Sequence, residues 1–387
     1  MLVDHDDSLR RALLAEGVAE RGACDAEAGK QVPLERMSSS SRAIGGKRAM
    51  ILLRTLAGTL LALSLAGPAT GQQGGTDGQR FAGELMRHLG LDPAGRLIEL
   101  ENGAVVHNGV PSQEKLADEV AAAGSMLLVR GREASAVIDA FLHTETFLQV
   151  HKVKRQQAVE PNAGDGPAFA GLPFPGSESV AELVKAPRRS LNLSVAEGER
   201  LSRLDLAAPD LAGRARAAFA EILAARLRSY ATRGVAGVEA YVREGGQVVE
   251  PRVELRTALA SLAFVQREFP GFLDRLGAGG SDVTYYWMER SVERVIVLIL
   301  SAELRTRGAT AALGADLHFY AAREYNSMLT VIGVIPYTDA SLVFAVNHTF
   351  TDRVTGMGST VRRTVARNRI ASELARHLDE TRKRLAR

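Results

Sequence analysis

The side chains best able to do chemistry lie in the last third of the chain, where aromatic, acidic and histidine residues alternate with others. Alternate residues of a strand share one face, so these side chains would gather on one wall of a sheet. Small-molecule pockets combine an apolar wall with a few orienting polar groups, and this set offers both. The candidate ligand-binding residues are Tyr285, Trp287, Glu289, His318, Tyr320, Phe344, His348 and Arg353. Ordinary core and rim residues of a sheet would give the same pattern.

Catalysis and metal binding have weaker support in the same region. His318 and His348 could meet Glu289 or Glu324 as metal ligands or as the acid–base set of a hydrolase. The H-E-x-x-H and H-x-x-x-H spacings that would fix such a geometry are absent. Nucleophile elbows, P-loops and dinucleotide fingerprints are also absent after residue 71. We therefore predict no catalytic residue, no metal site and no cofactor, and we favour a binding protein over an enzyme.

Five strands and one long helix must position the candidate side chains. Short connections such as Thr338–Ala340 favour an antiparallel meander. Arg294–Leu304 is apolar on both faces, which is typical of a central strand covered on both sides. We expect strands at Val283–Arg290, Arg294–Leu304, Asp316–Tyr325, Met328–Tyr337 and Ser341–Phe350, and a basic helix from about Ser359 to Arg387.

Residues 72–160 form an α/β segment in this interpretation and contribute further strands. Asn102-Gly103 favours the tight turn of a two-residue hairpin. Val137, Ile138 and Phe141 lie on one side of a short helix. The expected elements are a helix at Phe81–Leu89, a hairpin at Leu97–Val106, a helix at Gln113–Ala123, a strand at Ser125–Arg130, a helix at Glu133–Leu142 and a strand at Phe147–Lys154.

A loop rich in proline and glycine, residues 161–177, separates this segment from residues 178–387. It is either a disordered connection or a flap beside a site. The second part begins with helices, because Ser194-Val-Ala-Glu197 matches a capping box. Leu211–Thr232 and Val253–Phe269 then have the apolar stripe of amphipathic helices.

These elements predict an α+β fold, with a curved antiparallel sheet, a long C-terminal helix packed across it and a helical insertion. Residues 72–387 could form one domain. The order of the elements resembles the helix-grip architecture of START-like domains, in which sheet and helix enclose an apolar cavity. This resemblance rests on element order alone, and it implies a cavity between the sheet and the last helix.

A second resemblance is carried by short segments between about Val180 and Leu385. They are Tyr286-Trp287-Met288-Glu289, Phe319-Tyr320-Ala321, Val346-Asn347-His348-Thr349-Phe350-Thr351-Asp352, and Val180–Leu193 with the capping box that follows it. They are similar to an uncharacterised family of secreted bacterial proteins. The resemblance implies export and a shared fold, and no chemistry. Its relatives have a cysteine pair near Lys185–Leu191, where this chain has none.

Residues 1–71 have the features of an N-terminal extension and a signal peptide. Basic residues precede the apolar run Thr55–Ala66, and small residues follow it, which favours cleavage near Gly71. Translation could begin at Met1 or at Met37. The single cysteine, Cys24, lies in this part, so the exported chain would contain no thiol. We therefore expect a periplasmic or secreted protein.

The charge of the chain is too mild to imply a nucleic-acid partner, which would also be a poor partner for an exported protein. With 48 Lys and Arg against 45 Asp and Glu, the net charge is only +3. The last helix is nevertheless rich in cations: Arg362, Arg363, Arg367, Arg369, Arg376, Arg382, Lys383, Arg384 and Arg387. It could contact an anionic membrane surface, or it could be a solvated outer face.

We therefore expect an exported, soluble protein that binds an apolar or amphipathic, lipid-like molecule between the sheet and the last helix. The alternative is a non-catalytic interaction or scaffold protein of the cell envelope whose sheet is simply packed. A hydrolase using the histidine–carboxylate cluster is a third interpretation.

Overall fold

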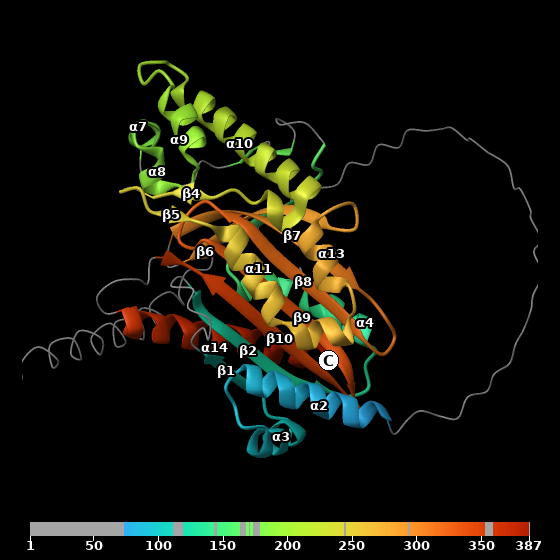
Figure 1. Ribbon diagram of the computed structural model, residues 1–387. Coiled ribbons are helices and arrows are strands. Elements are labelled where there is room, and N and C mark those ends of the chain that lie inside the picture. Colours follow the sequence, from blue (N-terminus) through green and yellow to red (C-terminus); the bar gives the residue numbers. More distant parts are fainter. Residues whose placement is uncertain are drawn as a thin grey trace, which may run out of the picture. The chain divides into compact units, whose positions relative to one another are not determined.

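An antiparallel sheet organises the part of the chain that the structure describes (Figure 1). The structure is a computed structural model that describes residues 73–110, 119–142, 145–162, 168–169, 171–172, 179–243, 245–292, 295–352 and 359–386. Within these ranges eight strands pair in the order β1-β2-β10-β9-β8-β7-β6-β3. Their bounds are β1 Val106–Val110, β2 Glu119–Val129, β3 Val153–Val159, β6 Thr284–Val292, β7 Val295–Thr306, β8 Ala312–Ala321, β9 Ser327–Tyr337 and β10 Ala340–Phe350.

The five-strand meander predicted from the sequence is confirmed. β6 to β10 each pair antiparallel with the next strand in the chain. β10 then pairs with β2, and β6 pairs with β3, so both ends of the meander are extended by strands from the N-terminal part. β7 is a central strand, and most of its side chains are buried, as its two-sided apolar sequence indicates.

A β-bulge changes which side chains of β8 share a face. Leu300 of β7 pairs with Tyr320, but the next residue, Ser301, pairs with His318. Phe319 is therefore the extra residue, and Phe319 and Tyr320 both belong to the same core cluster. The predicted sharing of a face by His318 and Tyr320 is wrong, because the bulge reverses the alternation between them.

Helices from the middle of the chain and from its N-terminal part cover one face of the sheet, here called the α11 face (Figure 1). The main contacts come from α2 (Gln73–His88), α10 (Leu211–Arg233), α11 (Pro251–Ser261) and α13 (Phe272–Ala278). The remaining elements of this part are α7 (Val180–Lys185), α8 (Pro187–Ser190), α9 (Val195–Ser202), η1 (Gly234–Gly237), α12 (Ala263–Glu268) and the small strands β4 (Tyr241–Val242) and β5 (Val248–Val249). The predicted capping box is present, because Ser194 and Glu197 bond to each other's backbone N–H groups.

The C-terminal helix α14 (Ser359–Leu385) covers the opposite face, here called the α14 face, together with α4 (Ala134–Phe141) (Figure 1). The predicted α+β class, with a long last helix across the sheet, is therefore confirmed. Ala371, Leu374 and Leu378 of α14 pack in the same cluster as Leu127 of β2. At Gly109 of β1 a Cβ would lie 3.1 Å from the carbonyl oxygen of Arg367, so a glycine there lets the helix backbone approach the sheet edge.

The expected hairpin at Leu97–Val106 is wrong. Its first half is helix α3 (Pro93–Glu101), which begins with Asp92 as a side-chain cap and proline in its first turn. Asn102 is the C-cap of α3, and Gly103 has a φ of 86°. The N–H groups of Gly103 and Ala104 donate back to the carbonyls of Leu100 and Glu99, which is a Schellman motif. The Asn-Gly pair therefore ends a helix here.

Two further N-terminal predictions fail. Residues 119–123, expected at the end of a helix, belong to strand β2, and residues 111–118 lie outside the described part. Phe147–Lys154, expected as a strand, contains the end of α5 (Glu145–Val150) and the start of β3. Lys152, in the turn between them, has a φ of 53°. Because this left-handed conformation is not that of a strand, a continuous strand cannot pass through Lys152.

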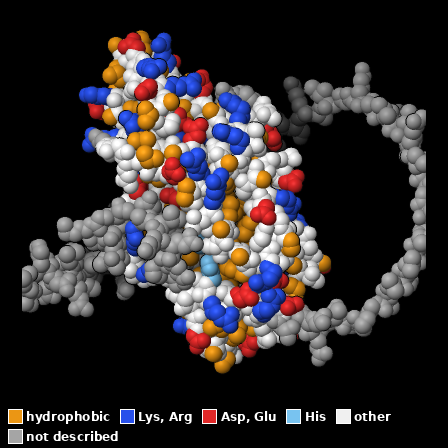
Figure 2. All heavy atoms as spheres, in the orientation of Figure 1, with side chains coloured by type: hydrophobic (Ala, Val, Ile, Leu, Met, Phe, Trp, Pro, Cys, Tyr) orange, Lys and Arg blue, Asp and Glu red, His pale blue; other side chains and the backbone are white. Residues whose placement is uncertain are grey.

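The described residues belong to one compact unit. The predicted signal peptide and most of the proline- and glycine-rich loop lie outside the described residues. Within the described ranges, none of the helices has a stretch apolar and long enough to cross a bilayer. On the face shown in Figure 2, acidic and basic side chains are interspersed rather than separated by sign.

Candidate functional site

Most of the predicted ligand-binding residues lie on the α11 face, where they are packed in the core. Trp287 is 3% exposed and Phe344 is fully buried. The ring of Phe344 lies 4.8 Å from the ring of Phe81 in α2. The Tyr285 hydroxyl donates a 2.9 Å hydrogen bond to the carbonyl of Gly280. These aromatic residues are therefore part of the hydrophobic core, which the sequence pattern left open as the alternative.

Two more candidates on this face contact arginines. Glu289 accepts hydrogen bonds of 2.6 and 2.9 Å from Arg155 of β3. The guanidinium of Arg226 lies 4.5 Å from the ring centroid of Tyr320, and burial raises the pKa of the tyrosine. Tyr320 therefore stays neutral beneath a buried cation. Arg353, the last of the candidates, lies outside the described residues.

The two candidate histidines lie on opposite faces of the sheet. His348 Nε2 is 3.2 Å from the hydroxyl of Ser261 in α11. His318 lies on the other face, with its Nε2 3.0 Å from Asp316 and its Nδ1 2.7 Å from the hydroxyl of Tyr325. The sheet separates them, so they do not form a joint acid–base or metal-binding set.

A pocket of about 220 Å³ lies on the α14 face, between the sheet and the last helix. This is where the sequence predicts a cavity, but none of the seven described candidates lines it. Its walls are formed by β6, β9, β10, the turn between α5 and β3, the β8–β9 connection and α14. The lining residues are Val150, His151, Lys152, Arg290, Ser291, Val292, Glu324, Tyr325, Met328, Thr330, Asn347, Thr349, Thr351, Ala366, Arg369, Ile370, Glu373 and Leu374.

One wall of the pocket is apolar because of the spacing of three residues in α14. Ala366, Ile370 and Leu374 are four residues apart and so share a stripe of the helix. Met328 of β9 and Val292 of β6 add apolar surface from the sheet. This wall offers a surface for a hydrocarbon group, which gains free energy by leaving water.

The opposite wall is polar, and its groups bond to one another. Asn347 donates a 2.8 Å hydrogen bond to Thr330 and accepts one of 2.6 Å from Thr349. Tyr325 adds a phenol whose pKa is raised by burial, so it remains protonated at neutral pH. The two walls together make the pocket amphipathic.

Arg290 of β6 is the most buried cation of the pocket, with 16% of its side chain exposed. Its Nε donates a 2.9 Å hydrogen bond to the carbonyl of His151, which fixes the guanidinium. Its terminal nitrogens lie 3.6 Å from Glu373 and 3.9 Å from the sulfur of Met328. Glu373 also lies 3.4 Å from Nε of Arg369, so one carboxylate stands between two guanidinium groups.

A pair of histidines joins the pocket rim to α14. Nε2 of His151 lies 3.2 Å from Nδ1 of His377. Burial lowers the pKa of His377 to about 4. Burial lowers the pKa of His151 as well, and the charges of Arg290 and His377 lower it further. Both rings are therefore neutral at pH 7, and one donates a hydrogen to the other.

A smaller hollow of about 20 Å³ lies behind the pocket and shares four lining residues with it: His151, Arg290, Met328 and Thr330. His318 and Asp316 also line this hollow. His318 is thus the one predicted ligand-binding residue that lies next to the pocket, and it reaches the pocket through its bond to Tyr325. Glu324, expected only as a metal ligand or acid–base group, lines the pocket itself.

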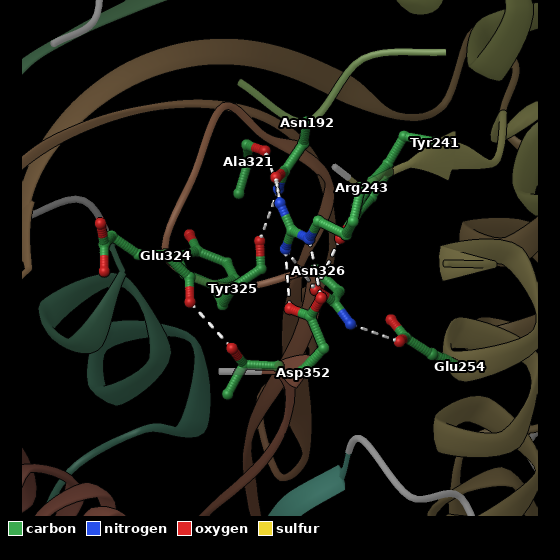
Figure 3. A network of polar contacts seen from close by, with 10 residues as sticks. Asn192, Tyr241, Arg243, Glu254, Ala321, Glu324, Tyr325, Asn326 and Asp352 are labelled. Atoms are coloured by element: carbon green, nitrogen blue, oxygen red, sulfur yellow. Dashed lines mark hydrogen bonds and ion pairs between the residues drawn. The ribbon is translucent and has the colours of Figure 1, made fainter. Parts of the chain in front are cut away.

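A buried polar network holds the β8–β9 connection, which supplies Glu324 and Tyr325 to the pocket (Figure 3). Arg243 forms two 2.7 Å bonds to Asp352, and it also donates to Asn192 and Asn326. Asn326 in turn donates a 2.8 Å bond to Glu254 of α11. The groups are bonded to one another, so we interpret the network as support for the pocket wall. The sequence gives no periodic signal for it.

Among the residues that the structure describes, no three His, Cys, Asp or Glu side chains are placed to hold a metal ion. A scan against models of known protein families and searches of curated proteins and solved structures found no match.

Proposed function

We propose that this chain is an exported protein that binds a small amphipathic molecule between the sheet and α14. The observation that supports this proposal is the pocket itself, with an apolar helix wall facing a polar sheet wall. Binding pockets are mostly apolar concavities with a few polar groups that orient the ligand. This pocket has that composition, and it lies between two elements far apart in the sequence.

Backbone strain at the pocket supports the proposal independently. Among the described residues, three that are not glycine have a positive φ: Lys152, Glu324 and Thr338. Lys152 and Glu324 both line the pocket. Such conformations cost of order 1–3 kcal/mol each and tend to occur at functional sites.

Export and membrane contact are also part of this proposal. Export is supported by the basic, apolar and small-residue layout before residue 72. Contact of α14 with an anionic membrane surface has less support. Arg382 donates to the carbonyl of Gly103 and pairs with Asp379, and Lys383 pairs with Asp379 and Glu380, so these cations are partly compensated.

A pair of neighbouring residues on α14 allows a direct test of the pocket. Ala366 lines it, whereas Val365 is 62% exposed on the outer side of the helix. Ala366→Phe should fill the pocket and abolish binding of the neutral dye N-phenyl-1-naphthylamine, and Val365→Phe should leave binding unchanged. Far-UV circular dichroism of both variants checks that the helix and sheet persist.

Native mass spectrometry of the protein purified from its own envelope, followed by organic extraction, should then detect a small bound molecule. Ala366→Phe should lose this mass. If the unmodified protein carries no such mass and binds no dye, the proposal is wrong, and the envelope scaffold becomes the better account.

A further inference from the structure

The charge around Arg290 distinguishes one part of the pocket from the rest. Arginine keeps its charge at any accessible pH, and a cation removed from water is costly unless it is paired by hydrogen bonds. The closest carboxylate contact of Arg290 among the described residues is the one of 3.6 Å to Glu373. That distance is too long for a good hydrogen bond. One terminal N–H also bonds to the Tyr325 side chain, and the guanidinium carries five N–H donors in all, so donor capacity toward the pocket remains.

The other carboxylates near Arg290 are bound to different partners. Asp316 lies 3.0 Å from His318, and Glu324 lies 3.4 Å from Nε of Arg323. The pocket lining contains Lys152, Arg290 and Arg369 against Glu324 and Glu373, so its formal charge is positive. An anion is therefore the complement that the lining favours.

The geometry of the walls indicates where the anion would lie. The hydroxyl and amide groups of Thr330, Asn347 and Thr349 bond to one another, which leaves the guanidinium as the strongest donor. The α14 stripe at Ala366, Ile370 and Leu374 provides the place for an apolar group. The polar end of a ligand would thus lie at Arg290 and its apolar end against the helix.

We propose that the ligand is an amphipathic carboxylate, with its head paired to Arg290 and its hydrocarbon part against α14. This inference rests on the proposed binding function and names the ligand class. A carboxylate matches the planar fork of one guanidinium with two parallel hydrogen bonds. A phosphate monoester carries about −1.5 to −2 charges, more than one arginine neutralises, and Glu373 would repel it more strongly than it repels a carboxylate of single charge.

The test compares ligands that have the same ten-carbon alkyl chain and different head groups. Decanoate, 1-decanol, decyl phosphate and decyltrimethylammonium each compete with the neutral dye for the full-length mature protein. Decanoate should bind about 10- to 100-fold more tightly than 1-decanol, because a charge-assisted hydrogen bond usually increases affinity by about this factor. Arg290→Gln should remove this preference while 1-decanol still binds, and Arg290→Lys should retain part of it.

Arg305→Gln is the matched control, because the Arg305 side chain is 19% exposed, close to the 16% of Arg290, but it does not line the pocket. This variant should keep the preference for decanoate. Equal affinity for decanoate and 1-decanol, or tighter binding of the phosphate or the ammonium compound, would overturn the carboxylate assignment and leave the pocket as a binding site. Failure of every probe, dye included, would refute the binding function itself. If Arg290→Gln does not fold, the relative affinities of the four head groups for the unmodified protein still test whether the ligand is a carboxylate.

Discussion

The variant Trp287→Ala tests whether the α11 face is packed core and the α14 face holds the ligand pocket. Trp287 is the only tryptophan of the chain, and it is 3% exposed in the cluster beneath the helical insertion. The pocket lining does not include it. The substitution should therefore destabilise the protein and leave ligand binding by the folded fraction unchanged.

The magnitude follows from the surroundings of the indole. A tryptophan buries on the order of 200 Å², which corresponds to about 5 kcal/mol at 25 cal/mol per Å². Its Nε1 is buried and has no hydrogen-bond partner among the described residues, so removing it relieves about 1–2 kcal/mol. The guanidinium of Arg155, 5.6 Å from the ring centroid, adds about 0.5–1 kcal/mol to the loss. The expected loss in the free energy of unfolding is about 3–5 kcal/mol, the range typical of such truncations.

Urea unfolding followed by far-UV circular dichroism measures this loss, because the variant has no tryptophan fluorescence. Trp287→Phe is the control: it keeps a ring and removes only the unpaired N–H, so its midpoint should lie much closer to that of the unmodified protein. An unchanged midpoint for Trp287→Ala, together with loss of dye binding, would refute this reasoning and identify the α11 face as the ligand site.

Two further predictions concern buried polar groups. The pKa of His377 is about 4 in the folded state and about 6.5 in the unfolded state, so the unfolded state binds more protons between these two pH values. The contribution of His377 to the free energy of unfolding should therefore be at its maximum above pH 6.5. It should fall by up to about 3 kcal/mol as the pH is lowered from 6.5 to 4. His377→Gln should reduce this slope in urea titrations at pH 7 and pH 5, while the part due to the lowered pKa of His151 remains, and an equal slope in both proteins would contradict the prediction. Glu197→Ala should cost about 3–5 kcal/mol, because it leaves the Arg226 side chain, which is 5% exposed, without its two hydrogen bonds of 2.7 and 2.6 Å. Replacing both residues by methionine should restore much of the loss, and an additive effect in this double variant would show that the ion pair is not the cause.

The meander and the last helix could be predicted from the sequence because local pattern and tertiary burial agree there. Alternation along β10 places Phe344 in one core cluster and Val343 and Ala345 in the other. In α14 the apolar stripe holds at Ile370, Leu374 and Leu378, which pack against the sheet, but not at Val365, which is 62% exposed. The N-terminal part was predicted less well, because its signals are ambiguous: Asn102-Gly103 serves equally as a hairpin turn and as the end of a helix.

The candidate site could be predicted in position but not in its residues. Aromatic side chains suggested a ligand wall, yet bulky residues are also what a helix needs to fill the space against a sheet. Arg290, Glu373 and His151 come from elements far apart in the chain, and no spacing in the sequence links them. The bulge at Phe319 also could not be predicted from the regular alternation of side chains along a strand. This bulge alone places His318 on the other face of the sheet.

The location of the pocket follows from how the two faces are covered. On the α11 face, several helices bring large side chains such as Phe81, Phe219 and Tyr230 into one cluster, so the surface is filled. On the α14 face a single long helix contacts mainly β2, β1 and β10. A sheet twists from strand to strand while a helix runs nearly straight, so the helix separates from the sheet toward β9 and β6. The small side chain of Ala366 and the mutually bonded Thr330 and Asn347 leave that gap open, and the charge of Arg290 makes it selective.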